Sequence, residues 1–301
     1  APMARCRMCQ FIPKCDFCDV SLTYHRRLNT LSCHYCGAVY PVPKVCPNCG
    51  EPTIEIAGFG TERLEDDLGA VFGEARVVRM DLDTTRNKDA HSKIIDDFSE
   101  HKADILVGTQ MVTKGLDFGH VELVGVLNAD ALVNFPDFRS AERAFNMLEQ
   151  VGGRSGRRGD GERGRVIVQT YTPDHPVLRF ASTHDYEGFY KAELEERRAF
   201  NYPPFARIIN IYVKHRDAST ATRCAEAFGA DLRSILGKRV SAVQEPPVSR
   251  IQNLYIRKIM LKIEADASMT KVKEILRESY VRLSAAPTTR ALTVYYDVDP
   301  V

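Results

Sequence analysis

The sequence lacks any long apolar run, any strong excess of charge and any shortage of apolar side chains. No apolar segment approaches the roughly 18 residues that cross a bilayer, and no leader-like segment is present, so we expect a soluble protein of the cytoplasm. The formal net charge of +1 neither requires a nucleic-acid partner nor excludes one, because local strips of lysine and arginine suffice for such binding. With 301 residues, 44% hydrophobic and 27% charged, the chain is long enough for two folded domains.

An initiator methionine is also lacking, since the chain begins Ala1-Pro2-Met3 and enters a cysteine motif at Cys6. It closes on a strand-like run that stops abruptly at residue 301. We interpret the start as the boundary of a truncated or engineered piece. Trimming of a mature chain by a methionine aminopeptidase is the alternative.

Cysteine is almost absent after residue 49, where Cys224 alone remains, in a helical pattern typical of a buried small side chain. The other eight cysteines form four Cys-x-x-Cys knuckles: Cys6/Cys9, Cys15/Cys18, Cys33/Cys36 and Cys46/Cys49. Two intervening residues place both thiolates on one side of a tight turn, as a tetrahedral zinc site requires. Glycine follows the second cysteine at Gly37 and Gly50, where a positive φ would turn main-chain amides toward the sulfurs.

Eight thiolates suffice for two four-cysteine sites, and such closed sites leave no coordination position for water. We therefore predict two structural zinc ions rather than a catalytic one. A disulfide framework is the alternative, and a cytoplasmic location disfavours it. His25 and His34 could be spare ligands, but with eight cysteines present we expect surface or hydrogen-bonding residues.

The residues alone leave the pairing of the four knuckles open. Residues 20–24 and 31–32 predict a hairpin. That hairpin would bring the second and third knuckles together and leave the first and fourth to close around them.

The same module carries aromatic rings among basic side chains. Rings that stack on bases and cations that meet phosphates are suited to holding single-stranded DNA. Some of the rings must instead cover the knuckles, because so small a module has little other core. A protein contact is an equal alternative. The rings are Phe11, Phe17, Tyr24, Tyr35 and Tyr40.

From residue 53 onward the pattern changes to alternating strands and helices. Predicted strands cover residues 54–56, 76–80, 105–108, 121–128 and 165–170. Predicted helices cover residues 61–71, 89–101 and 140–151, with Thr61 as the N-cap of the first. This order predicts a doubly wound α/β lobe with a parallel sheet.

Two loops in this lobe carry candidate chemistry. The first, residues 108–118, follows a predicted strand at its carboxyl end, where ligands bind in such sheets. The second, residues 150–157, follows a helix, and its glycines would allow a close turn. Its Arg154 and Arg157 are placed to grip a γ-phosphate and stabilise the charge of phosphoryl transfer. A solvated basic turn is the alternative, and we expect it for the neighbouring Arg158.

Together the loops resemble motifs V and VI of superfamily 2 helicases. With the four knuckles, residues 127–130 (Leu-Asn-Ala-Asp) and residues 137–143 (Asp-Phe-Arg-Ser-Ala-Glu-Arg), the chain resembles the PriA (primosomal protein N-prime) family over essentially its whole length. The resemblance implies an α/β fold in three parts. These are a two-zinc module (residues 1–53) inserted in a RecA-like parallel-sheet helicase lobe 2 (residues 54–200), and a C-terminal α+β sandwich domain (residues 201–301).

The resemblance also implies residue roles. Arg154 and Arg157 would be arginine fingers, supported by Gln150. Residues that would bind the nucleotide and couple its cleft to the DNA track are Gly108, Thr109, Gln110, Lys114, Gly115 and Asp117, and Gly153 is a further candidate for binding the nucleotide. The nested pairing of the family assigns one zinc to Cys6, Cys9, Cys46 and Cys49, and the other to Cys15, Cys18, Cys33 and Cys36.

By the same resemblance, the whole protein is a bacterial 3′-to-5′ DNA helicase that recognises abandoned replication forks and reloads the primosome. The chain departs from that family because it has no Gly-x-x-x-x-Gly-Lys-[Ser/Thr] phosphate loop and no Asp-Glu-x-His for Mg²⁺. ATP and Mg²⁺ would need the missing N-terminal half, so we expect no ATP hydrolysis by this chain alone. Its expected partners are that half, forked and single-stranded DNA, single-stranded-DNA-binding protein and primosome loading proteins, in the nucleoid and with no membrane.

The last hundred residues show a different pattern. The predicted order is strand (207–214), helix (218–236), strand (239–243), strand (254–264), helix (268–283) and strand (292–297). This β-α-β-β-α-β order predicts a small α+β sandwich. Its candidate binding residues are Arg250, Tyr255, Arg257 and Lys258, although solvated strand positions explain them equally well.

Two functions remain in competition. In the first the chain is half of an ATP-driven motor, and in the second it is a zinc-stapled scaffold that holds a fork and partner proteins. The motor should fail when Arg154 is changed, whereas the scaffold should not. A metal-dependent hydrolase is disfavoured, because the predicted metal sites are closed and the adjacent acidic pairs Asp66/Asp67 and Asp96/Asp97 splay around helix axes.

Overall fold

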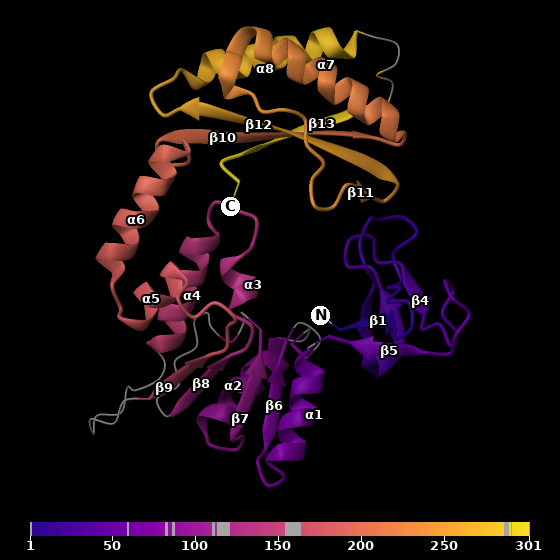
Figure 1. The fold of residues 1–301 in the computed structure, drawn as a ribbon, viewed down its shortest axis with the longest axis vertical. Helices are drawn as coiled ribbons and strands as arrows, with labels where there is room; N and C mark the ends of the chain where they lie inside the picture. The colour runs from indigo at the N-terminus through magenta and orange to yellow at the C-terminus, as the bar shows by residue number, and fades with distance from the viewer. Residues whose placement is uncertain are drawn as a thin grey trace. The chain divides into compact units, whose positions relative to one another are not determined.

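The computed structural model describes residues 2–58, 60–81, 84–85, 88–109, 112, 121–153, 164–285, 289 and 291–300. Its chain divides into two compact units, Ala1–Gly58 with Arg197–Val301, and Phe59–Glu196 (Figure 1). Within the described residues, no helix is both long and apolar enough to cross a membrane.

The cysteine-rich region, residues 2–58, is built from short antiparallel strands. They are β1 (Met3–Cys6), β2 (Thr23–His25), β3 (Thr30–Ser32), β4 (Val39–Pro41) and β5 (Ile54–Ala57), with a 3-10 turn η1 (Arg26–Leu28). β1 pairs with β5, and β2, β3 and β4 form a second sheet. The predicted hairpin is confirmed as β2–β3, joined by η1 and by Asn29 in the left-handed region (φ 49°).

The cysteine-rich region is too small for a large apolar core, and cysteine side chains make up half of its buried cluster. The buried cluster consists of Ala4, Cys15, Cys18, Leu22, Leu31 and Cys33. Tyr24, Tyr40 and Ile251 pack against it, the last from the other end of the chain. Three of the six buried residues are cysteines, so the stability of this core depends on the bonds or the bound ion that keep the three sulfurs in place.

The C-terminal domain is a four-stranded antiparallel sheet covered on one face by two helices (Figure 1). Its elements are β10 (Ala206–His215), α7 (Ala218–Leu236), η3 (Gly237–Arg239), β11 (Arg250–Ile251), β12 (Leu254–Glu264), α8 (Met269–Ser284) and β13 (Thr293–Val298), with strand order β11-β12-β10-β13. Alternate residues Ile209, Ile211 and Val213 of β10 are at most 1% exposed and pack with Phe228 and Leu232 of α7. Cys224 is buried in the same core, as predicted.

One predicted strand of this domain is wrong. Residues 239–243 do not form a strand, because Gly237 at φ +62° begins the 3-10 turn η3. Only isolated bridges from Val240 to Leu261 and from Gln244 to Lys258 remain. The rest of the predicted α+β order is confirmed.

The unit Phe59–Glu196 alternates strands and helices, as predicted. The strand expected at residues 54–56 is β5, but it pairs antiparallel with β1 of the cysteine-rich region instead of joining the parallel strands of this unit. The strands of the unit are β6 (Val77–Met80), β7 (Ile105–Gly108), β8 (Leu123–Val126) and β9 (Arg165–Val168). Its helices are α1 (Thr61–Val71), α2 (Lys88–Ser99), α3 (Asp130–Val133), α4 (Ser140–Gly152), α5 (Pro176–Ser182) and α6 (Tyr186–Ala199), the last running into the other unit. The strands are parallel, but in the described residues they form two pairs, β6–β7 and β8–β9, rather than one continuous sheet.

The predicted N-cap of α1 is wrong by one residue. Gly60 occupies the cap position, and no side chain caps the helix. Thr61 is the first residue of the helix, and its hydroxyl donates to Asp81 Oδ2 at 2.6 Å, directly after β6.

Candidate functional site

Two clusters of four sulfurs are the best-defined chemical sites in the described residues. One gathers Cys6, Cys9, Cys46 and Cys49, and the other gathers Cys15, Cys18, Cys33 and Cys36. In each cluster the four Sγ atoms lie within 4.8 Å of one another. We call them the outer site and the inner site, because the first brings together the first and last knuckles and the second the two between. This is the nested grouping.

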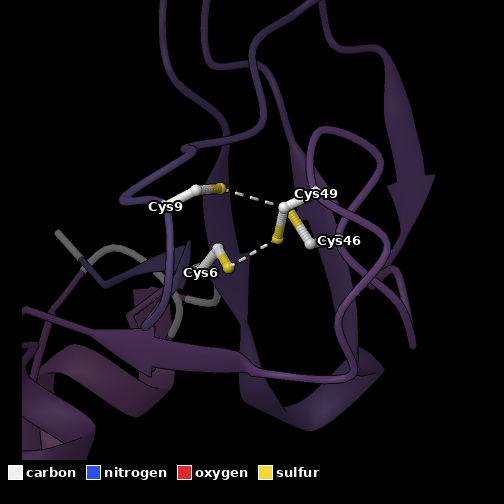
Figure 2. Close-up of side chains that lie close together, drawn as sticks. All are labelled: Cys6, Cys9, Cys46 and Cys49. Atoms are coloured by element: carbon white, nitrogen blue, oxygen red, sulfur yellow. Dashed lines mark hydrogen bonds between the residues drawn. The ribbon is translucent and has the colours of Figure 1, made fainter.

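The geometry of both clusters fits a tetrahedral cation. Nearest sulfurs lie 3.6 Å apart, in the pairs Cys6–Cys49, Cys9–Cys46 and Cys15–Cys36 (Figure 2 shows the outer site). Sulfurs around a tetrahedral zinc, each about 2.3 Å from the metal, would lie about 3.8 Å apart. All eight cysteines are free thiols, so this spacing is not that of disulfides.

The glycines of the knuckles take the positive φ that the sequence predicts, +77° at Gly37 and +78° at Gly50. Their own amides, however, donate to the carbonyl oxygens of Cys33 and Cys46, each at 2.9 Å, and not to sulfur. It is the next amide along the chain that reaches the sulfur, from Ala38 to Cys36 and from Glu51 to Cys49. The predicted conformation is confirmed, and the amide that it turns toward the sulfur is the one after the glycine.

Neighbouring side chains of the outer site stabilise its thiolates. The Thr53 hydroxyl lies 3.2 Å from Cys6 Sγ, and the Asn48 amide donates to Cys9 Sγ at 3.4 Å. Hydrogen bonding from Thr53 and then from the Cys9 main chain lowers the pKa of Cys6 to about 6. The hydrogen bond from the Asn48 amide is the largest of the effects that lower the pKa of Cys9. Neither Asn48 nor Thr53 was predicted as part of the site, although both lie within four residues of a knuckle cysteine.

The inner site is more deeply buried. Cys15, Cys18 and Cys33 are 3%, 0% and 1% exposed, whereas Cys49 of the outer site is exposed. Burial raises the pKa of Cys18 to about 12. A dication among the four sulfurs offsets that cost of ionising buried thiols, so this chemistry favours a metal ion with a closed thiolate shell.

The aromatic side chains of the region divide between core and surface. Tyr24 and Tyr40 pack against the buried cluster. The Tyr40 hydroxyl also lies 3.6 Å from Cys15 Sγ. Phe17 and Tyr35 are 44% and 51% exposed. Of the five rings, Phe17 and Tyr35 are therefore the exposed ones, and Phe11 is intermediate.

His25 and His34 lie against each other rather than at a metal cluster. Their rings are stacked with Nε2 atoms 3.2 Å apart. They are hydrogen-bonding surface residues, as predicted.

The two candidate nucleotide loops begin at the ends of defined elements. Gly108 and Thr109 are exposed at the carboxyl end of β7. Gln150 is exposed on α4, whose Phe145 and Leu148 pack near Val126 of β8 and Val168 of β9. The remaining predicted residues of these loops lie outside the described residues: Gln110, Lys114, Gly115, Asp117, Arg154 and Arg157.

Gly153 does not make the close turn that its residue type suggested. Its φ of −67° and ψ of −8° are right-handed, so it extends α4 by one position. Its amide donates to Glu149 O at 2.8 Å. The conformation of Gly153 is therefore one that other residues also adopt.

Four residues of the C-terminal domain were candidates for binding, and the structure gives structural partners to Arg257, Arg250 and Tyr255. Arg257 is 8% exposed, donates to Thr222 Oγ1 at 2.9 Å and pairs with Glu245 at 2.8 Å. Arg250 donates to Asp16 O at 2.9 Å and lies over the ring of Tyr255. Neither guanidinium is a freely solvated cation.

Comparison with known proteins gives three family matches along the chain. The PriA DNA helicase Cys-rich region matches residues 15–41, the Helicase conserved C-terminal domain matches residues 59–159, and the Primosomal protein N C-terminal domain matches residues 198–301. The first match contains the four cysteines of the inner site and none of the outer site.

Curated relatives agree with these matches. The replication restart protein PriA of Bacillus subtilis (strain 168) is 43% identical over 279 residues, which are 92% of this chain and 34% of that protein. The PriA proteins of Synechocystis sp. and Treponema pallidum are 40% and 36% identical over 94% and 99% of the chain. The chain spans 35% and 44% of the lengths of those two relatives.

Proposed function

The chain belongs to the PriA family of replication restart proteins, and we propose that it is the second motor lobe, zinc module and C-terminal domain of an ATP-driven 3′-to-5′ DNA helicase. The whole protein would recognise stalled or abandoned replication forks and reload the primosome. Residues 1–53, 54–200 and 201–301 are the proposed boundaries of the three parts.

The observation that carries this proposal is the position of the two loops. The first starts at Gly108, at the carboxyl end of a parallel strand, where α/β sheets bind ligands. The second follows α4, a helix packed near the strands of the other parallel pair. The match of residues 59–159 to the helicase C-terminal domain covers both loops and ends two residues after the second.

In the proposed mechanism Arg154 and Arg157 grip the γ-phosphate and stabilise the charge that spreads over it during transfer. Gln150, exposed on α4, supports them. The residues that bind the nucleotide and couple its cleft to the DNA track are Gly108, Thr109, Gln110, Lys114, Gly115 and Asp117, and Gly153 is a further candidate for binding the nucleotide. Since this sequence has no phosphate loop, ATP and Mg²⁺ would be held by the N-terminal half, and the chain alone would hydrolyse no ATP.

The eight cysteines would hold two structural zinc ions, one in each site. A closed thiolate shell offers no position for substrate or water, so zinc here would stabilise the fold of the cysteine-rich region. Forked and single-stranded DNA, single-stranded-DNA-binding protein and primosome loading proteins are the proposed partners, at forks in the bacterial cytoplasm.

The experiment compares Arg154→Ala with Arg158→Ala in the full-length parent protein. DNA-stimulated ATP hydrolysis should fall about a thousandfold in the first, as when an arginine finger is lost, and little in the second. Fork binding, measured in parallel, should survive in both. The chain on its own should show no turnover that depends on Arg154.

A binding scaffold is the alternative function, and the two closed metal sites favour it. In that case Arg154→Ala would leave both turnover and replication restart unchanged in the parent protein. Loss of turnover with intact fork binding rules the scaffold out as the whole function.

A further inference from the structure

Three of the four knuckles share one main-chain pattern. The residue after the second cysteine donates its amide to the carbonyl of the first: Gln10 to Cys6 at 3.0 Å, Gly37 to Cys33 at 2.9 Å, and Gly50 to Cys46 at 2.9 Å. All three donors have positive φ, at 61°, 77° and 78°. Gln10 thus adopts the glycine conformation without being glycine.

That turn aims the following amide at the second cysteine of the knuckle. Phe11 donates to the sulfur of Cys9, Ala38 to Cys36 and Glu51 to Cys49. Each of these three knuckles therefore supplies its own N–H···S hydrogen bond, from the residue two positions after the second cysteine.

The second knuckle, Cys15 to Cys18, departs from this pattern. One hydrogen bond is shared with the other knuckles: the Cys15 amide donates to Val20 O at 3.0 Å, as the Cys6 amide does to Phe11 O. The Asp19 amide, however, donates to Arg250 O at 2.8 Å instead of to Cys15. The sulfur of Cys18 accepts the amide of Gln252 at 3.4 Å, a residue 234 positions away.

Gln252 and Asn253 form the two-residue turn between β11 and β12. Both lie in the left-handed region, with φ of 50° and 60°, which is the conformation of a type I′ hairpin turn. This turn exposes the Gln252 amide at the tip of the hairpin. The next amide, Asn253, donates to Phe17 O at 2.8 Å.

Side chains around the turn reinforce the same contact. Arg250 Nη1 donates to Asp16 O at 2.9 Å, and Ser249 Oγ donates to Asp19 Oδ2 at 3.1 Å. Ile251 packs against the buried cluster that contains Cys15, Cys18 and Cys33. The hairpin thus contacts every residue from Asp16 to Asp19.

We propose that the Ser249–Asn253 hairpin is part of the inner metal site, because it supplies to Cys18 the N–H···S hydrogen bond that the second cysteine of every other knuckle receives from its own knuckle. Metal retention at the inner site then depends on the hairpin, and the docking of the hairpin depends on the metal. The outer site has no such dependence, since Asn48 and Thr53, which serve it, are local. The proposal rests on the zinc occupancy proposed above.

The physical reason lies in the charge of a closed thiolate site. Four thiolates around a dication carry excess negative charge, and amides that donate to sulfur stabilise it. Loss of such an outer contact typically weakens metal binding about 10- to 100-fold. Only the main chain of Gln252 is needed, because the side chains of Gln252 and Asn253 are exposed.

Two variants of the same pair of residues test the proposal in the full chain loaded with zinc. Gln252→Asn with Asn253→Gly keeps the type I′ turn, since Asn-Gly is the preferred sequence for it. Gln252→Val with Asn253→Val opposes it, because β-branched residues disfavour positive φ. A chromogenic chelator then reports the release of each zinc with time. We expect the Val-Val variant to release one zinc at least about tenfold faster than the Asn-Gly variant and the other at an unchanged rate.

Asn48→Ala is the reciprocal variant and shows which of the two zinc-release rates belongs to which site. It removes a donor to Cys9 and should accelerate the zinc that the hairpin variants leave unchanged. Hydrogen exchange adds an independent measure. Removal of the inner zinc should speed exchange of the Asp19, Gln252 and Asn253 amides but not of those pairing β10 with β12.

If the Val-Val variant loses its sheet, the Arg250→Ala and Ser249→Ala double variant replaces it, with Arg239→Ala as control. Arg239 is an ion-paired arginine of the same domain that pairs with Glu264. Equal release from turn-keeping and turn-breaking variants, or unchanged exchange at Gln252 after loss of the inner zinc, overturns the proposal. Fewer than two zinc ions per chain would instead overturn the zinc occupancy on which it rests.

Discussion

Gly108 faces Met80 across the parallel β6–β7 pair so closely that a Cβ atom on Gly108 would lie 2.7 Å from the Met80 carbonyl oxygen. It would also overlap the side chain of Val112. Since a carbonyl of a paired strand cannot move aside as a flexible side chain does, packing alone requires glycine at this position. Any role of Gly108 in coupling nucleotide to DNA is additional to that requirement.

Gly108→Ala should therefore lower the free energy of unfolding by about 1–3 kcal/mol, the usual cost of forcing extra atoms into a packed site. Gly69→Ala is the matched control, because a Cβ there meets nothing within 4 Å and the position lies inside α1. That change should stabilise the protein by up to about 1 kcal/mol through helix propensity. Urea unfolding of both variants measures the difference, and equal effects would contradict the packing argument.

The hydrogen bonds of Asp217 at the start of α7 predict that the stability of the fold depends on pH. Its carboxylate caps the helix, accepting the Thr220 hydroxyl at 2.6 Å, the Ser219 hydroxyl at 2.8 Å and the Thr220 amide at 2.7 Å. These bonds, with the Thr220 side chain first, lower the pKa of Asp217 to about 2. Because the folded pKa lies below the unfolded value of about 4, the ionised cap stabilises the fold above pH 4, and this contribution is lost as the pH falls through 2.

The measurement compares melting temperatures of the protein and of Asp217→Asn between pH 2 and pH 7. The stability difference should stay constant above about pH 5 and shrink between about pH 4 and pH 2. Asp266→Asn removes the same charge from an exposed position of the same domain and serves as control. A difference for Asp217→Asn that is independent of pH would show that the charge of the cap does not matter.

Arg257 should matter for stability rather than for DNA binding. Its guanidinium is buried against Thr222 and the main chain of Ile256, whereas its ion-pair partner Glu245 has a side chain that is 66% exposed. Arg257→Ala removes buried hydrogen bonds and should cost about 2 kcal/mol of unfolding free energy. Glu245→Ala should cost under about 1 kcal/mol, as for other exposed ion-pair partners. Denaturant unfolding measures the stability of the two variants, and titration with DNA measures the affinity of the folded proteins. Weaker DNA affinity of Arg257→Ala at unchanged stability would show that Arg257 is a binding residue.

Local patterns in the sequence predicted the local elements well. The helix expected at 218–236 is α7 with the same bounds, and the strand expected at 105–108 is β7. Both follow from periodicity and flanking residues within one segment. The strand expected at 239–243 failed because Gly237 turns the chain, which the apolar pattern after it does not reveal.

Relationships across the chain were largely beyond the sequence. Spacing alone did not group the eight cysteines, since four knuckles can pair in more than one order. The predicted hairpin favoured the nested order, and the family resemblance assigned the ligands to it. The sequence around Gln252 does not indicate that its amide donates to Cys18, because the same residues would form an exposed two-residue turn whether or not a sulfur accepted that hydrogen bond. Main-chain donors leave no signature in residue type.

The two metal sites should differ in what they contribute to stability. The inner site places Cys15, Cys18 and Cys33 in the buried cluster of the cysteine-rich region, together with Leu22 and Leu31. The outer site lies outside that cluster, and its Cys49 is exposed. Loss of an inner metal would therefore leave three buried thiols within this cluster, whereas loss of an outer metal would leave the buried thiols of Cys6 and Cys46 outside it, where the first and last knuckles join.

Cys36→Ser and Cys49→Ser test this difference, one for each site, with Cys224→Ala as a cysteine variant outside both. Each ligand variant should bind one zinc per chain instead of two, and Cys224→Ala should keep two. Cys36→Ser should lower the melting temperature of the cysteine-rich region further than Cys49→Ser, because a structural zinc contributes its binding free energy to folding where the core depends on it. Zinc content by atomic absorption, together with thermal unfolding, measures both quantities. Equal destabilisation by the two variants would mean that β1 and β5, which join at the outer site, contribute as much to this region as its buried core does.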